Sequence, residues 1–166
     1  MRMESADYIS GLPRKRMAAG VLFVDDLDRV LLVEPTYKDR WELPGGVVEH
    51  EESPFAAAVR EVREELGLTI APGRLLVLDW VPPDPFPSDG VMFVFDGGVL
   101  SADQLAAIAL PAEELRGWAW CDDDALAERL RDGLARRIVA ARRARADGVT
   151  VYLEDGYAVA GEHLED

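Results

Sequence analysis

The chain has 166 residues and a hydrophobic content of 49%, which suits one domain with a core of its own. Its formal net charge is -14, and a surface that acidic repels the phosphate backbone of nucleic acids and anionic membranes. The composition therefore predicts a globular protein with neither nucleic acid nor a membrane as its partner.

The N-terminal segment and the cysteine content indicate the compartment. Residues 1–16 are polar, lack the apolar stretch of a secretion signal, and predict a loose leader that ends in three basic residues. No apolar run reaches the length that spans a bilayer. Cys121 is the only cysteine, so an intrachain disulfide is impossible, and we expect a buried, inert thiol. These features predict a cytoplasmic protein.

Two strands are predicted next, over 17–24 and 30–34, because both segments are rich in valine, leucine and phenylalanine. The aspartate-rich segment 25–28 between them predicts a turn, since it is too short for a calcium-binding EF-hand loop. A loop over 35–40 then leads to Trp41.

A glycine pair, Gly45 and Gly46, precedes a segment with clear helix signals. Ser53 is a natural N-cap, a proline follows it at the first helical position, and Gly67 suits the position just past the helix end. The pattern predicts a tight glycine loop and then a helix over 54–66. On a helical wheel, one narrow stripe of apolar side chains is expected to face the core: Phe55, Val59, Val62 and Leu66.

Three glutamates, Glu61, Glu64 and Glu65, share another face of this helix, because positions i, i+3 and i+4 are neighbours. They repel one another near the helix C-terminus, where the macrodipole already disfavours negative charge. A hard divalent cation, which prefers oxygen ligands, would relieve that repulsion. For the helix alone the alternative is a solvated face with an ordinary pair between Arg60 and Glu64.

The wider pattern favours the metal site. Over 46–68 the spacing of glycine, glutamate, arginine and aliphatic positions is identified as the complete signature of the Nudix hydrolases, and no fixed position departs from it. The fixed polar and glycine positions are Gly46, Glu52, Arg60, Glu61, Glu64, Glu65 and Gly67.

The resemblance implies roles for these residues. Glu61, Glu64 and Glu65 would bind Mg²⁺ or Mn²⁺, and the backbone carbonyl of Gly45 would add a ligand. Arg60 would orient a neighbouring glutamate and complete the catalytic set. Gly46 and Glu52 would support the start of the helix.

The resemblance also implies the fold, an α/β/α sandwich around a mixed β-sheet in a single domain. We expect the Nudix domain to span 17–147, after the leader 1–16. A C-terminal hairpin and tail would occupy 148–166, with a type I′ turn at Asp155 and Gly156.

Two strands, 74–81 and 91–99, follow the helix, and a proline-rich loop over 82–90 joins them. Loops on a rigid scaffold commonly carry specificity, so this loop and its Phe86 are candidates for substrate contact. The remaining predicted elements, in order, are a weakly helical or irregular segment, a strand and two helices, over 100–111, 115–121, 124–131 and 133–146.

Several charged or aromatic side chains have two interpretations. Lys38 and Arg40 are the cations nearest to the predicted metal site and are candidate phosphate partners. Trp41 either stacks on a base at the site or packs in the core. Glu113 and Glu114 are a surface pair or, as in some Nudix relatives, one of them is a further site glutamate. The arginines of helix 133–146 are interpreted as a solvated face, with an interaction or nucleotide-facing surface as the alternative.

These observations predict divalent-metal-dependent hydrolysis of the pyrophosphate linkage in a nucleoside diphosphate joined to another moiety. The partner is then a small-molecule nucleotide. The alternative function is a Nudix-fold module that senses a nucleotide without cleaving it, although such a sensor has no need of all three glutamates. The sequence leaves the oligomeric state open and is compatible with a homodimer.

Overall fold

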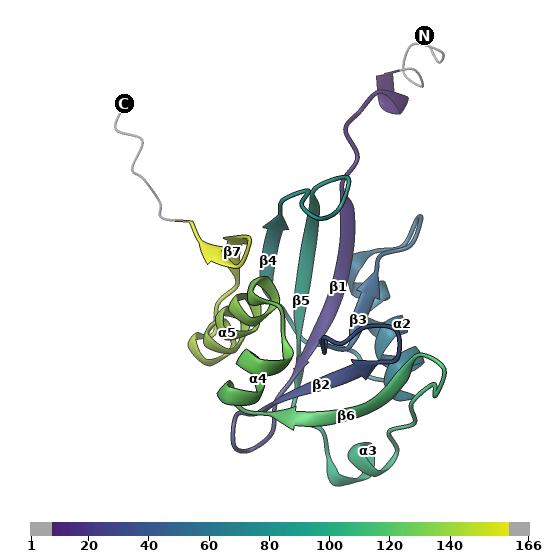
Figure 1. Ribbon diagram of the computed structural model, residues 1–166, viewed down its shortest axis with the longest axis vertical. Helices are drawn as coiled ribbons and strands as arrows, with labels where there is room; N and C mark the ends of the chain where they lie inside the picture. The colour runs from purple at the N-terminus through teal and green to yellow at the C-terminus, as the bar shows by residue number, and fades with distance from the viewer. Residues whose placement is uncertain (1–7, 160–166) are drawn as a thin grey trace.

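The computed structural model describes residues 8–159 and forms a layered α/β fold (Figure 1). The strands are β1 (Arg16–Phe23), β2 (Val30–Pro35), β3 (Gly45–Val47), β4 (Leu75–Val81), β5 (Gly90–Gly98), β6 (Leu115–Cys121), β7 (Val151–Glu154) and β8 (Tyr157–Ala158). The helices are α2 (Pro54–Leu66), α3 (Ala102–Ala106), α4 (Asp123–Arg129) and α5 (Asp132–Asp147).

The main sheet is mixed and has six strands in the order β3-β1-β5-β4-β7-β8. β1 pairs parallel with β5 and antiparallel with β3, whereas β4 pairs antiparallel with β5 and parallel with β7. β2 and β6 form a separate antiparallel pair. One row of neighbouring residues crosses four strands of the main sheet: Ala18, Met92, Asp79 and Leu153.

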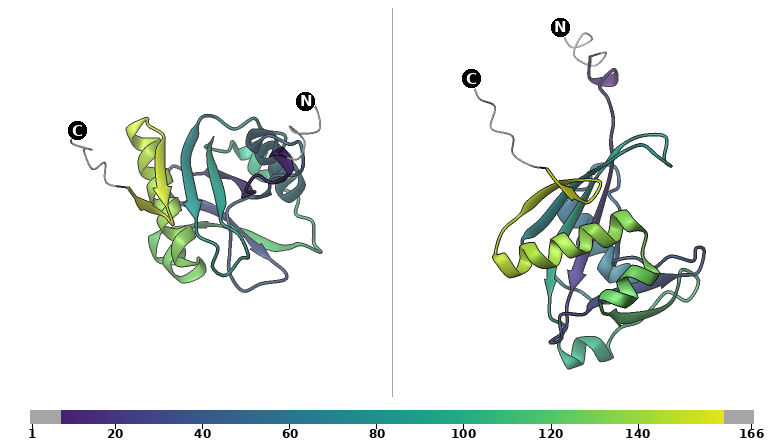
Figure 2. Two further views of the ribbon diagram at one scale, coloured as in Figure 1. Left: turned by 90° about the horizontal axis from the view of Figure 1, so that it is seen from above. Right: turned by 60° about the vertical axis from the view of Figure 1, so that its left-hand side comes forward.

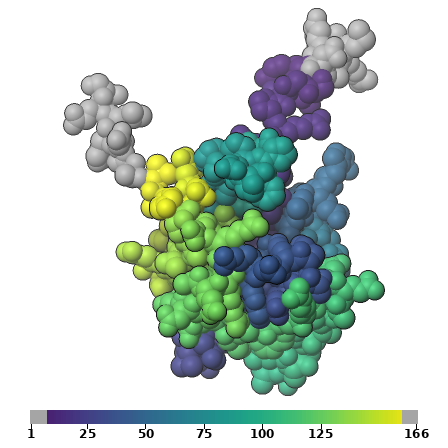
Figure 3. All heavy atoms as spheres, viewed as in Figure 1, coloured from purple at the N-terminus to yellow at the C-terminus, as the bar shows by residue number. Residues whose placement is uncertain are grey.

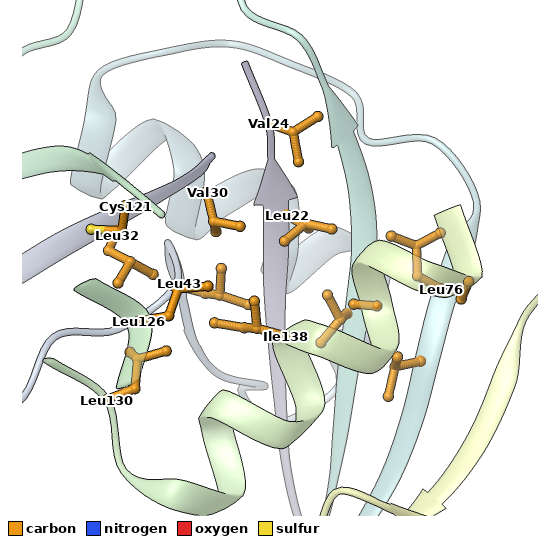
Figure 4. Close-up of a cluster of buried hydrophobic side chains, with 14 of the residues drawn as sticks. Leu22, Val24, Val30, Leu32, Leu43, Leu76, Cys121, Leu126, Leu130 and Ile138 are labelled. Carbon is orange, nitrogen blue, oxygen red and sulfur yellow. The ribbon is translucent and has the colours of Figure 1, made fainter. Parts of the chain in front are cut away.

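The two long helices cover opposite faces of the main sheet, with α5 in front of it and α2 behind it in the right-hand view of Figure 2. Side chains alternate along β1, so Leu22 joins the hydrophobic cluster under α5 and Val21 joins the cluster under α2. Figure 4 shows the first cluster, which brings together Leu22, Leu76 of β4 and Ile138 of α5. The predicted α/β/α sandwich around a mixed sheet is confirmed.

The predicted boundaries of α2 are confirmed. Ser53 has extended backbone geometry, and its hydroxyl accepts a hydrogen bond of 3.1 Å from the Ala56 N–H. Gly67 ends the helix with φ of 69°, a left-handed conformation that glycine adopts without strain. The caps of this helix were therefore readable from the chain alone.

Two predictions around α2 were wrong. The glycine pair forms a strand, β3, because Gly45 and Gly46 pair with Gly20 and Ala19 of β1. Phe55 is not a core residue: it is 42% exposed and lies edge-on to the Phe95 ring, with 5.5 Å between the ring centroids. The row that packs on the sheet instead contains three buried side chains spaced four residues apart: Ala58, Val62 and Leu66.

Elsewhere the boundaries move by a few residues. The helix predicted over 124–131 ends at Arg129, because Leu130 already has extended backbone geometry. The segment predicted as weakly helical contains the short helix α3, which a capping box between Ser101 and Gln104 starts. Asp155 and Gly156 both have positive φ, 51° and 77°, which confirms the predicted type I′ hairpin turn.

The proline-rich loop and the C-terminal hairpin lie beside each other at one end of the molecule, teal and yellow in Figure 3. The predictions for residues 1–7 of the leader and 160–166 of the tail lie outside the described residues. Within the described part, none of the helices has the length and apolar character needed to cross a bilayer.

Candidate active site

Two glycines let β3 pass close to β1 and α2. A Cβ atom on Gly45 would lie 2.3 Å from the Ala19 carbonyl oxygen, and the backbone φ of Gly45 is 151°. A Cβ atom on Gly46 would lie 2.4 Å from Glu61 Oε1. The glycine pair therefore brings the bare backbone of β3 against the carboxylates of α2.

Arg60 is the centre of a hydrogen-bond network at the exposed side of α2. Its Nε and Nη2 donate to the two oxygens of Glu52, at 2.9 Å each. Its Nη1 donates to Glu61 at 2.8 Å and to Glu64 at 3.0 Å, and its Nη2 also reaches the Val47 carbonyl at 3.0 Å. One guanidinium thus ties the loop glutamate, two helix glutamates and β3 together.

Glu52 is held as a carboxylate. The hydrogen bonds from Arg60, and then the bond of 2.9 Å from the Glu49 backbone N–H, lower the pKa of Glu52 to about 2. The same contact raises the pKa of Arg60, so this pair stays fully ionised. Glu52 therefore fixes the orientation of Arg60 at the point where the loop enters the helix.

Glu65 has the opposite environment. Burial raises its pKa to about 8, against a hydrogen bond of 2.8 Å from the Gly45 N–H, and the carboxylates of Glu61, Glu42 and Glu114 repel its charge further. Burial also raises the pKa of Glu61, although Arg60 opposes the shift. The protein alone therefore stabilises the ionised forms of Glu61 and Glu65 incompletely.

The fit of this group to a divalent cation follows from its chemistry. Among the described residues, no three His, Cys, Asp or Glu side chains already stand in an arrangement suited to a metal ion. Instead, Arg60 holds Glu61 and Glu64, while Gly45 holds Glu65. The candidate metal ligands are all oxygen atoms, which Mg²⁺ and Mn²⁺ prefer. Two of them belong to Glu61 and Glu65, whose ionised forms the protein stabilises only in part.

The flanking cations named from the sequence have partners within the protein. Lys38 forms an ion pair with Glu42. Arg40 donates to the carbonyl oxygens of Glu128 at 2.9 Å and Leu130 at 3.4 Å, at the end of α4. Lys38 is thus paired with Glu42, whose charge in turn acts on Glu65. Arg40, in contrast, is bound to the end of α4.

Trp41 packs on the cluster beneath α5, and the Arg129 guanidinium lies 4.2 Å from its ring centroid. One face of the indole is therefore already covered, which favours its packing role over a role in stacking on a base. Cys121 is fully buried near Arg129, and burial raises the pKa of its thiol, in agreement with the inert role expected.

The proline-rich loop is attached to the start of β1. Arg16 lies 4.1 Å from the Phe86 ring centroid and donates through Nε to the Ser88 carbonyl at 2.9 Å. Asp89 pairs with Lys15 and accepts a hydrogen bond of 2.7 Å from the Trp80 indole. Phe86 remains half exposed on this anchored loop.

Comparison with known families decides the classification, since the family model of the NUDIX domain matches residues 14–142. The chain belongs to the Nudix family. It is 52% identical over 64 residues to diphosphoinositol polyphosphate phosphohydrolase 3-alpha from Mus musculus. That match covers 37% of this chain and 39% of the relative, so the chain spans about two fifths of the length of the curated relatives it matches.

Solved structures share the Nudix fold along most of the chain. A MutT protein from Methanosarcina mazei Go1 has a TM-score of 0.63 at 23% identity, covering 83% of this chain and 99% of that one. An ADP-ribose pyrophosphatase from Streptococcus suis 89-1591 has a TM-score of 0.66 at 19% identity, covering 85% and 99%. At such identities these structures show the fold alone.

The Nudix motif predicted the carboxylates of α2, but sequence reasoning missed the roles of two further residues, Glu42 and Arg137. Glu42 and Glu114 lie close enough to raise the pKa of Glu65. Glu114 belongs to the pair Glu113 and Glu114, for which the sequence leaves a site role open, whereas no sequence signal marks Glu42. Arg137, assigned to a solvated face, instead donates to the fully buried Asp79, and the available signal was that single acid inside an otherwise apolar strand.

Proposed function

We propose that this Nudix protein is a hydrolase that uses Mg²⁺ or Mn²⁺ to cleave the pyrophosphate linkage of a nucleoside diphosphate joined to another moiety. The observation that carries the proposal is the position of Glu61 and Glu65, two acids of raised pKa packed against the bare backbone of Gly45 and Gly46. The activity of the relative with 52% identity over 64 residues, a diphosphoinositol polyphosphate phosphohydrolase, supports hydrolysis of phosphoanhydride bonds.

The metal ligands in this proposal are Glu61, Glu64, Glu65 and the Gly45 carbonyl. A bound divalent cation supplies neutralisation of the pyrophosphate charge and activation of water at neutral pH. This need is acute here, since the net charge of -14 otherwise repels a polyphosphate substrate.

The remaining steps belong to the side chains of the chain itself. Arg60, fixed by its two bonds to Glu52, presets the carboxylates of Glu61 and Glu64 and limits their repulsion. The Gly45 N–H orients Glu65 from the other side. A glutamate of this group accepts the proton of the attacking water. Lys38, which forms an ion pair with Glu42, would contact a substrate phosphate.

A panel of dinucleotides, nucleotide sugars and nucleoside triphosphates tests the function directly. We expect Mg²⁺- or Mn²⁺-dependent release of phosphorylated products, which EDTA abolishes. Glu61→Gln should remove most of the turnover, and Glu51→Gln, an exposed loop residue with 86% of its side chain accessible, should not. Tight nucleotide binding without turnover across the panel would favour the sensing module instead.

The protein is further proposed to work in the cytoplasm. The support is its single, buried thiol, which suits a reducing compartment.

A further inference from the structure

A small cavity lies beside the candidate site, on the face of the sheet that α5 covers. Its volume is about 160 Å³, and it extends from Glu42, Gly45 and Gly46 to Arg137 on α5. Between these ends its walls are mainly apolar: Ala18, Leu43, Met92, Val94 and Leu134. Because small-molecule pockets usually measure about 300–1,000 Å³, this cavity suits one moiety of a substrate whose remainder lies on the carboxylates.

Arg137 is held rigidly at the far end of the cavity. Its Nε donates to Asp79 Oδ2 at 2.6 Å, and 12% of its side chain is exposed. Asp79 is fully buried, and its other oxygen accepts a hydrogen bond of 3.0 Å from the Gly156 N–H in the C-terminal hairpin. Asp79 lies next to Met92 in the sheet, and Met92 lines the cavity.

The terminal nitrogens of Arg137 have no acceptor among the described residues. A guanidinium carries five N–H donors, and only the Nε donor is used here. Within the described chain, Arg16 Nη2 is the buried side-chain nitrogen without a partner. The Nη1 and Nη2 groups of Arg137 are therefore not fully buried, and they belong to a residue that lines the cavity.

The charge balance indicates what these donors bind. Asp79 already neutralises Arg137, so the fork retains directed N–H donors but little net positive charge. Burying such a pair carries a desolvation penalty, and purely apolar packing is often equally stable. The apolar walls suit a flat aromatic ring. The Nη groups of Arg137, whose charge Asp79 compensates, suit a neutral oxygen acceptor on that ring better than they suit a phosphate.

We propose that this cavity takes the nucleobase and that Arg137 selects a base with a ring carbonyl. Its Nη groups would donate to the oxygen at C6 of a purine such as guanine or hypoxanthine, where adenine instead presents an amino donor. Asp79 is the positioning residue, because it fixes the direction of the guanidinium. This inference rests on the proposed nucleotide substrate and deepens it by naming the class of base.

Inosine monophosphate and adenosine monophosphate differ only in the group at C6 and in the proton on the adjacent N1, and their binding tests the inference. Calorimetric titration without metal keeps the measurement independent of turnover. We expect the wild type to bind inosine monophosphate on the order of tenfold more tightly, the size of one good base contact. Arg137→Met should abolish this preference, and Asp79→Asn should reduce it by loosening the guanidinium.

The controls separate recognition from folding. Arg143→Gln, an exposed arginine of the same helix, should keep the preference. Arg137→Lys keeps a charge opposite Asp79 but lacks the fork, so it should also lose the preference; it replaces the methionine variant if circular dichroism shows that variant unfolded.

Three results would overturn the inference: equal or tighter binding of adenosine monophosphate, an equal loss of both nucleotides in Arg137→Met, or Arg137-dependent binding of inositol hexakisphosphate, which would identify a phosphate site. A protein that hydrolyses nucleotides without any base preference overturns this inference alone. A protein that prefers inosine monophosphate but cleaves nothing overturns only the proposed hydrolysis.

Discussion

Arg60 donates hydrogen bonds of 2.9 Å to both carboxylate oxygens of Glu52. The contact joins the loop between β3 and α2 to the middle of α2. The contact spans eight residues of sequence, and the geometry is the bidentate fork that arginine alone provides for a carboxylate. Because the same guanidinium also contacts Glu61 and Glu64, its orientation sets theirs.

The pH dependence of stability should report this contact. The pKa of Glu52 is lowered to about 2 in the folded protein, below its ordinary value of 4.5. A lowered folded pKa stabilises the protein at pH above about 4.5, and this contribution disappears as the pH falls toward 2. In urea titrations Glu52→Gln should be less stable than the wild type at pH 7, and the gap should close in acid. The exposed control Glu51→Gln should show no such closing gap, and a pH-independent gap for Glu52→Gln would contradict the prediction.

The two glycines of β3 should respond differently to alanine. In Gly45→Ala the new Cβ meets the Ala19 backbone and the φ of 151° becomes strained, so we expect a loss of stability of about 1–3 kcal/mol or more. In Gly46→Ala the obstacle is the carboxylate of Glu61, which rotates away at little cost. Gly46→Ala should therefore melt near the wild type but lose metal-dependent activity. Equal melting temperatures for the two variants would show that the Gly45 backbone relaxes.

How much the sequence reveals differs between local and long-range features. The ends of α2 follow from Ser53 and Gly67, because caps are local. The apolar stripe predicted for α2 was wrong at Phe55, because a helical wheel ranks side chains by polarity alone. In the structure the small side chain of Ala58 packs on the sheet instead. Its small size lets the partly buried Glu61 and Glu65 lie close to the sheet. β3 was missed because a strand of three residues exists only through pairing with β1.

The same distinction applies to the arginines of α5. Their spacing suited a solvated face, but the partner of Arg137 is 58 positions away in β4. Arg136, Arg142 and Arg145 likewise bond to aspartates of other elements, and among these arginines Arg143 alone fits the solvated description well within the described chain. Contacts between distant segments carry no local sequence signal, which is why this part of the site could not be predicted.

Substitution of Phe86 should alter substrate choice. The ring is 49% exposed on a loop that Arg16 and Asp89 anchor to the sheet, so it presents a fixed apolar surface. Phe86→Ala removes a surface cation–π contact worth only about 0.5–1 kcal/mol, and the fold should persist. We expect the ranking of kcat/KM values across the substrate panel to change while the metal concentration for half-maximal activity stays constant. A uniform loss on all substrates, together with a lower melting temperature, would assign Phe86 to packing.

Glu65→Gln should be more stable than the wild type without metal, and increasingly so as the pH rises. The folded pKa of Glu65 is about 8, above its ordinary value of 4.5, so between these pH values the folded protein holds a proton that the unfolded chain releases. A raised acid pKa therefore lowers stability as the pH rises through this window, and glutamine removes that loss. Denaturant titrations of EDTA-treated protein at pH 5 and pH 8 measure it. A stability difference that does not grow between pH 5 and pH 8 would contradict the raised pKa.

Metal should reverse the order of the two proteins. A cation compensates the charge of Glu65 and displaces its proton, so metal affinity should rise as the pH increases toward 8. At a metal concentration about 100 times Kd the wild type gains about 2.7 kcal/mol, which corresponds to a rise in Tm of roughly 5–10 °C for a chain of this size. Glu65→Gln lacks one anionic ligand, so this rise should shrink or vanish. Its turnover should fall by more than the 10- to 100-fold typical of removing a residue that only neighbours a metal ligand.

The variant is thus expected to be the more stable protein in EDTA and the less stable one in Mg²⁺ or Mn²⁺. Thermal melts and activity in parallel decide the matter, because a variant that keeps both the metal-induced shift and near-full turnover would remove Glu65 from the metal site.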